Sequence, residues 1–106
     1  MPIKLLIAYN VKLGREEEYY RFVMGEFLPT AQGIGLEIVE AWHTVWGDYP
    51  ERLIAMAADS QKELNEILNS ERWREMETKL GTYVNDYQRL AVRFQSGFQF
   101  FKPREG

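Results

Sequence analysis

The period of the hydrophobic pattern changes several times along this chain, and the order of those changes is the strongest constraint on its fold. The first segment alternates between large apolar residues and smaller or more polar ones, which predicts a strand over residues 3–12. The large residues are Ile3, Leu5, Ile7, Tyr9 and Val11. Their face is apolar enough to lie under helices, whereas the alternate face, which carries Asn10, suits a partly polar space.

A helical pattern follows this strand. Gly14 and Arg15 lead into three consecutive glutamates, which favour the positive end of a helix dipole. Apolar residues then recur four positions apart, which predicts a helix over residues 15–28 that Pro29 ends. The expected buried stripe consists of Tyr19, Tyr20, Val23, Phe27 and Leu28.

The middle of the chain has the pattern of a β-hairpin. Gly33 and Gly35 allow a turn into residues 36–46, which are rich in β-branched and aromatic side chains and predict the second strand. Residues 47–50 have the composition of a hairpin loop, and the small and apolar residues 52–58 predict a third, antiparallel strand.

The C-terminal half begins with a capping box at residues 60–63, which predicts a helix over residues 61–69. Asn69 and Ser70 interrupt this helix and are expected to cap a second helical segment.

From Trp73 to Phe94 apolar residues recur three and four positions apart, as in a long helix. The pattern leaves the end of that helix open, because residues 90–94 could equally be extended, with Asn85 and Asp86 ending the helix. Aromatic residues 98–101 predict the last strand.

The predicted element order is β-α-β-β-α-β, which is typical of an α+β ferredoxin-like domain with a four-stranded antiparallel sheet and two helices on one face. We expect one domain over residues 1–106. Its other sheet face would carry Leu6, Trp42 or Trp46, and Phe98 or Phe100. Because a monomer rarely leaves such a face bare, a second copy is expected to cover it in a homodimer.

Composition excludes several classes of function. The formal net charge of −3 is too balanced for a nucleic-acid or anionic-membrane surface. The absence of cysteine excludes disulfides, thiol nucleophiles and zinc–thiolate sites. No glycine-rich phosphate loop or paired-histidine metal motif occurs, so we expect no cofactor and no metal. The first apolar run is too short for a signal segment or a membrane span, which favours a cytoplasmic location.

Three residues are candidates for acid–base chemistry. His43 is the only histidine, and histidine is the side chain best suited to proton transfer near neutral pH. Regular alternation places it on the opposite face from Glu40. Glu40 is a candidate base if buried, although it could instead pair with Lys4 or Arg52. The amide of Asn10 can donate to a carbonyl or to bound oxygen without introducing charge, or it can serve as a strand-end turn residue.

Aromatic residues are the candidates for ligand binding. Core packing and dimer contacts would account for them, as would a flat hydrophobic ligand stacked among them. The candidate ligand-binding residues are Tyr9, Trp42, Trp46, Trp73 and Tyr87.

The chain resembles the dimeric α+β barrel superfamily, in which two ferredoxin-like sheets face one another. It is similar to the antibiotic-biosynthesis-type monooxygenases, the stress-responsive A/B barrel proteins and related uncharacterised bacterial families. The resemblance rests on the first strand up to Lys12, the step from Gly14 to Tyr19, the hairpin through Trp42 and Trp46, the stretch from Ser70 to Trp73, and the aromatic last strand. It implies that Asn10 matches the asparagine of the oxygenases in strand location, whereas Trp73 and His43 match only in residue type.

Two main hypotheses follow. The first is a small-molecule-binding or stress-related protein with a hydrophobic or aromatic ligand in the barrel. The alternative is a cofactor-independent monooxygenase or isomerase that uses Asn10, Glu40 or His43 on an aromatic substrate. A purely structural assembly protein would need only the dimer face. The lack of a cluster of titratable groups favours the binding protein.

Overall fold

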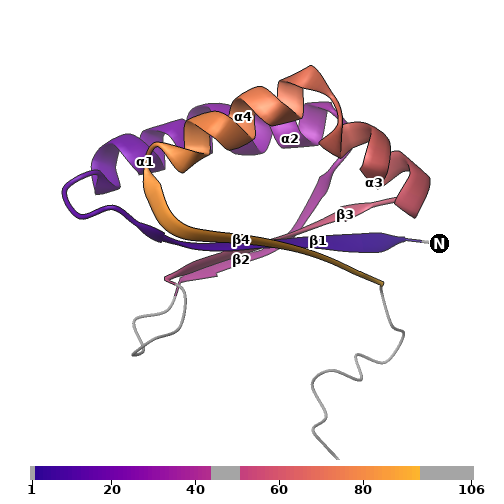
Figure 1. Cartoon of the computed structure of the whole chain (residues 1–106), viewed down its shortest axis with the longest axis horizontal. Coiled ribbons are helices and arrows are strands. Elements are labelled where there is room, and N and C mark those ends of the chain that lie inside the picture. The colour runs from indigo at the N-terminus through magenta and orange to yellow at the C-terminus, as the bar shows by residue number, and fades with distance from the viewer. Residues whose placement is uncertain (1, 44–50, 94–106) are drawn as a thin grey trace, which may run out of the picture.

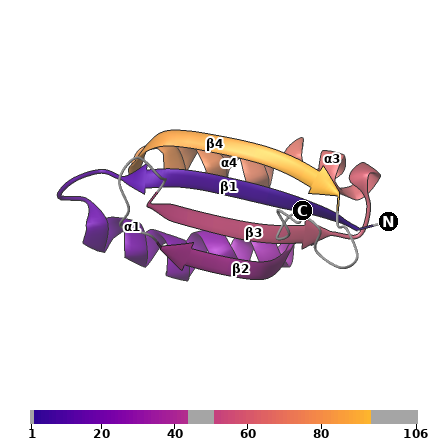
Figure 2. The same ribbon diagram turned by 90° about the horizontal axis from the view of Figure 1, so that it is seen from below.

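The computed structural model describes residues 2–43 and 51–93. Four strands form one antiparallel sheet in the order β2-β3-β1-β4 (Figure 2). They are β1 (Ile3–Val11), β2 (Glu37–His43), β3 (Arg52–Ala58) and β4 (Val84–Arg93). The helices are α1 (Glu16–Phe22), η1 (Val23–Phe27), α2 (Leu28–Gly33), α3 (Gln61–Leu68) and α4 (Glu71–Gly81), and they lie on one face of the sheet (Figure 1). The predicted ferredoxin-like α+β fold is confirmed.

The central strand β1 has the predicted alternation. Its large apolar residues face the helices and are buried, and β3 contributes Ile54, Met56 and Ala58 to the same face. The buried residues of β1 are Ile3, Leu5, Ile7, Tyr9 and Val11. The opposite face of the sheet, which we call the open face, is not covered by any of the described helices (Figure 1).

The first helix continues beyond its predicted end. It passes through the π-helical segment η1 into α2, which ends at Gly33, so the prediction that Pro29 ends the helix is wrong. Pro29 lies just after the π-helical segment η1, where the change from π-helical to α-helical hydrogen bonding accommodates a missing backbone N–H. The expected burial of Tyr20 is also wrong, because this residue lies next to Tyr19 on the helix and is 64% exposed.

Two serines define the next helices as predicted. The hydroxyl of Ser60 accepts a hydrogen bond from the backbone N–H of Glu63 at 3.1 Å, which caps α3. The hydroxyl of Ser70 accepts from the N–H of Trp73 at 3.2 Å, which caps α4. Each cap satisfies a backbone donor that the first turn would otherwise leave unpaired.

The helical pattern beyond Trp73 ends earlier than predicted, because α4 stops at Gly81 and β4 takes residues 84–93. The extended alternative for residues 90–94 is therefore correct for its described part, which pairs with β1 through Leu6 and Leu90. The fourth described strand of the sheet is β4. The predicted last strand, residues 98–101, lies outside the described residues. The predicted hairpin loop and the end of the second strand, residues 44–50, lie outside them as well.

Gly35 provides the first test of this fold. Its φ of +115° lies in a region that side chains rarely adopt, and an added Cβ would meet Cδ1 of Ile67 at 3.3 Å. We expect Gly35→Ala to lower the free energy of unfolding by at least about 1 kcal/mol. The matched variant Gly25→Ala, whose Cβ would meet nothing within 4 Å, should be neutral or gain up to about 1 kcal/mol. Urea denaturation at a fixed protein concentration measures the free energy of unfolding of both variants. A Gly35→Ala variant as stable as wild type would contradict the positive φ of Gly35 and its closeness to Ile67.

Candidate functional site

The open face carries an apolar strip across the sheet. The register places Leu6 opposite Ala55 on one side and Leu90 on the other, and it places Ala8 opposite Leu53 and Gln88. Leu90 is 58% exposed although it is a large hydrophobic residue. The same face also carries Lys4, Ala57 and Val92 and, at its β2 edge, the positions of Glu37, Glu40 and Trp42. Small residues therefore lie near the centre of the face, with larger apolar residues around them.

Asn10 lies at the end of this strip and links β1 to β4 and to Glu51, the residue before β3. Its Nδ2 donates to Oδ2 of Asp86 at 3.1 Å, and its Oδ1 accepts from the backbone N–H of Glu51 at 2.8 Å. Asp86 has a φ of 57° at the point where the pairing of β1 with β4 shifts register. Both ends of the amide are thus engaged in fixing the ends of the strands.

The predicted acid–base residues do not share one face. Glu40 is exposed and opposite Ala55, which places it on the open face. His43 is also exposed, but it lies opposite Arg52 on the face that carries the helices. Arg52 therefore lies on the face opposite to Glu40, and the register gives no support to a pair between them.

The predicted ligand-binding aromatics are also divided. Tyr9 and Trp73 are fully buried in the core on the helix side, where the ring of Trp73 lies 5.6 Å from that of Phe27. Tyr87 is partly buried and stacks on Tyr9 at a ring distance of 6.3 Å. Trp42 lies in β2 opposite Leu53 in the register, and Trp46 lies outside the described residues. The structure thus gives Tyr9 and Trp73 core positions, with no place on the open face.

Sequence reasoning missed a buried hydrogen-bonded tyrosine pair that includes Tyr9, and a separate, more exposed group around Tyr87. The hydroxyl of Tyr9 shares a 2.7 Å hydrogen bond with the hydroxyl of Tyr19 from α1. The hydroxyl of Tyr87 donates to Glu77 at 2.6 Å, and Arg89 binds the same carboxylate at 2.8 and 3.0 Å. The only signal in the sequence is the presence of hydroxyl-bearing aromatics at buried positions, which require polar partners.

The environment of these tyrosines shifts their ionisation. Burial raises the pKa of Tyr9, and the neighbouring Tyr19 raises it further. Burial also raises the pKa of Tyr19. For Tyr87, burial and the hydrogen bond to the Glu77 carboxylate together raise the pKa. All three hydroxyls are therefore neutral at physiological pH.

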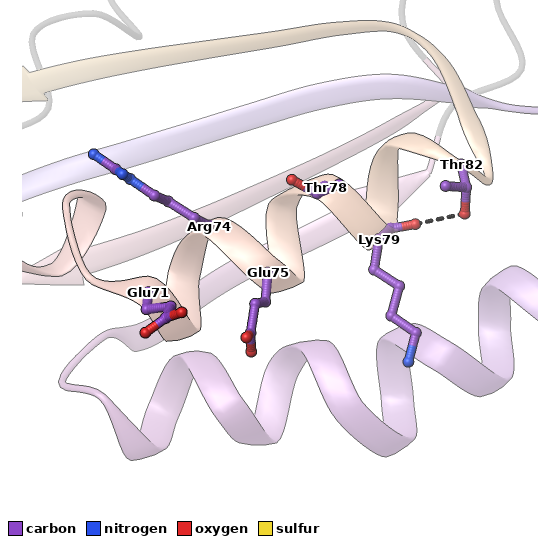
Figure 3. Close-up of a pocket in the computed structure, with 6 residues that line it drawn as sticks. All are labelled: Glu71, Arg74, Glu75, Thr78, Lys79 and Thr82. Atoms are coloured by element: carbon purple, nitrogen blue, oxygen red, sulfur yellow. Dashed lines mark hydrogen bonds between the residues drawn. The ribbon is translucent and has the colours of Figure 1, made fainter.

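The surface formed by the described residues includes two depressions among the helices, away from these tyrosines. The larger has a volume of about 470 Å³ and lies along α4; Glu75 and Lys79 point toward the neighbouring helix while Arg74 points away (Figure 3). The second is lined by Glu18, Arg21, Phe22, Glu26 and Tyr83. Neither contains a predicted site residue. A single helix supplies nearly all of the lining of the larger depression, so it cannot enclose a ligand.

Within the described ranges, 2–43 and 51–93, no group of three or more acidic or histidine side chains is arranged to hold a metal ion. None of the described helices has the length and apolarity that crossing a membrane requires.

No protein-family model matches the sequence, and no curated protein matches it significantly. Solved structures do match its fold. An ethyl tert-butyl ether D family protein from Bacillus halodurans aligns over 90% of this chain and 100% of its own, with a TM-score of 0.71 and 12% identity. A NIPSNAP family protein from Agrobacterium tumefaciens aligns over 92% and 96%, with a TM-score of 0.67 and 15% identity.

A third structure, from Bacteroides fragilis, aligns over 88% of this chain and 96% of its own, with a TM-score of 0.61 and 11% identity. It is described as a dimeric protein of unknown function with a ferredoxin-like fold. At these identities the likenesses show the fold alone, which is a ferredoxin-like α+β fold. The predicted similarity to monooxygenases is not confirmed.

The buried tyrosine pair predicts a coupling between two substitutions. Tyr9→Phe and Tyr19→Phe should each lower the free energy of unfolding by about 1–3 kcal/mol, because each leaves a shielded hydroxyl without its partner. The double variant should lose less than the sum of both. Tyr20→Phe is the matched control, since Tyr20 is exposed, and should stay within about 0.5 kcal/mol of wild type. Additive losses would contradict the pairing.

The raised tyrosine pKa values predict alkaline destabilisation. In the unfolded state these hydroxyls ionise near about pH 10, whereas in the folded state they hold their protons to higher pH. Stability is therefore full below about pH 10 and falls as the pH rises beyond it. Denaturant unfolding at about pH 9 and at about pH 11 measures the loss of free energy of unfolding. The double variant Tyr9→Phe, Tyr19→Phe should lose less free energy of unfolding over this pH range than wild type does. Equal stability at both pH values would contradict this prediction.

Proposed function

We propose that the chain forms a homodimeric α+β barrel in which the open faces of two copies meet around a small hydrophobic or aromatic ligand. The apolar strip on the open face is the observation that carries this proposal. It exposes Leu90 and partly exposes Leu6 and Leu53 on the side that no described helix covers. A large apolar face of this kind is characteristic of a surface that another sheet buries.

The small residues on this face support a ligand between the two sheets. Packed sheets lie about 10 Å apart, a gap that large side chains fill and small ones do not. Ala8, Ala55 and Ala57 lie on the two central strands, next to the larger Leu6 and Leu53. Facing copies would therefore enclose a space that is apolar at its centre, where a hydrophobic molecule would fit, with Lys4, Asn10 and Glu40 at its edges.

The fold of the Bacteroides fragilis protein, which is described as dimeric, is consistent with this assembly. A monooxygenase or isomerase in the same barrel would have to draw on Asn10 and Glu40, since His43 lies on the other face. Binding without catalysis needs neither residue. We favour binding because the amide of Asn10 is already hydrogen-bonded at both ends.

A pair of leucine variants tests the dimer face. Leu90→Glu puts a charge in the proposed interface and should shift the mass in solution from twice 12.5 kDa toward 12.5 kDa. Leu13→Glu is the matched control, because Leu13 is 95% exposed in the turn after β1, and it should stay dimeric. Light scattering coupled to size-exclusion chromatography measures both. A monomeric wild type, or a Leu90→Glu variant as dimeric as the control, would contradict the proposal.

Native mass spectrometry tests the ligand. The purified wild type should show a dimer that carries a reproducible extra mass, and that mass should be lost under denaturing conditions. The monomeric Leu90→Glu variant should not carry it, because a single open face encloses no space. An extra mass retained equally by monomer and dimer would place the ligand elsewhere, and a bare dimer would contradict a bound ligand.

A further inference from the structure

Arg52 is a charged side chain whose partly buried position neither the core packing nor the proposed barrel requires. It begins β3, lies opposite His43 of β2 and Tyr9 of β1, and is partly buried on the helix side of the sheet. Its Nη1 is shielded from solvent and has no hydrogen-bond partner in the described part of the chain. A guanidinium is always charged, and a shielded donor without a partner is unfavourable. A hydrogen-bond acceptor beside Arg52 would remove this cost.

Arg52 interacts with the side chain of Tyr19 but forms no ion pair within residues 2–43 and 51–93. Its guanidinium carbon lies 5.7 Å from the ring centroid of Tyr19, whose hydroxyl is bonded to Tyr9. Both tyrosines are neutral, because burial raises the pKa of each. The carboxylate of the adjacent Glu51 accepts from the backbone N–H of Val11 at 2.9 Å. Among the described residues, the ion pairs formed involve other arginines and lysines, and none involves Arg52.

We propose that Arg52 binds a small carboxylate at this end of the sheet, between the exposed His43 and the Tyr9–Tyr19 pair. The planar guanidinium fork matches the two oxygens of a carboxylate. One arginine with Glu51 next to it supplies little net positive charge, which suits a monoanion better than a phosphate dianion. The site lies on the face opposite to the proposed barrel, so it is a second site that does not depend on dimerisation.

His43 makes the binding directly observable. It is the only histidine in the chain, so its imidazole gives a single reporter signal in NMR spectra. Titration with benzoate should shift this signal until it saturates. Benzamide has the same ring without the charge, and it should cause little shift at the same concentrations. A shift of equal size with benzamide would overturn the requirement for an anion.

Substitutions then test the role of the guanidinium. Arg52→Gln should raise the Kd for benzoate about tenfold or more, and Arg52→Lys should weaken binding too, because it keeps the charge but loses the fork. Arg72→Gln, at an exposed position on α4, is the matched control and should leave the Kd unchanged. An unchanged Kd in a folded Arg52→Gln variant would overturn the proposal.

Two further results complete the test. If circular dichroism shows that Arg52→Gln is unfolded, Arg52→Lys and the comparison of benzoate with benzamide on the wild type decide the question. Inorganic phosphate that saturates the His43 signal at lower concentration than benzoate would overturn the choice of a carboxylate. Loss of the barrel ligand or of the dimer in the Leu90→Glu variant, with benzoate binding intact, would confirm that the two sites are separate.

Discussion

The two-sided packing of β1 is the interaction on which the rest of the structure depends. It pairs with β3 and β4 at the centre of the sheet, and its large residues form the floor of the core beneath the helices. The same alternation sends Leu6, Ala8 and Asn10 to the open face. One strand therefore determines both the core and the surface on which the proposed ligand space would form.

The parts of the fold that depend on local pattern could be predicted from the sequence. The first strand, β3, α3 and the caps at Ser60 and Ser70 all rest on alternation or on bonds within a few residues. The sequence does not distinguish β4 from a continuing helix, because Tyr83, Tyr87 and Leu90 also fit a helical spacing. Pairing with β1 decides that segment, and this long-range interaction leaves no local signature.

The candidate site likewise combines features that local pattern predicts with features that depend on contacts between elements. Alternation correctly separates His43 from Glu40, because the faces of a strand follow from the period of two. It cannot show that Tyr9 meets Tyr19, or that Glu51 and Asp86 engage the amide of Asn10, since these contacts join different elements. Several aromatics that the sequence offers for a ligand pocket instead form the core. The shielding of Arg52 depends on neighbours from other elements, which local pattern does not reveal.

In the proposed dimer, two copies face each other through the open side of the sheet. Isotope-filtered NOE spectroscopy on a mixture of labelled and unlabelled protein observes contacts between copies directly. The proposed dimer should give contacts between copies from the methyl groups of Leu6, Leu53 and Leu90. Intermolecular contacts confined to exposed residues of the helix layer, such as Tyr20 and Met24, would contradict it.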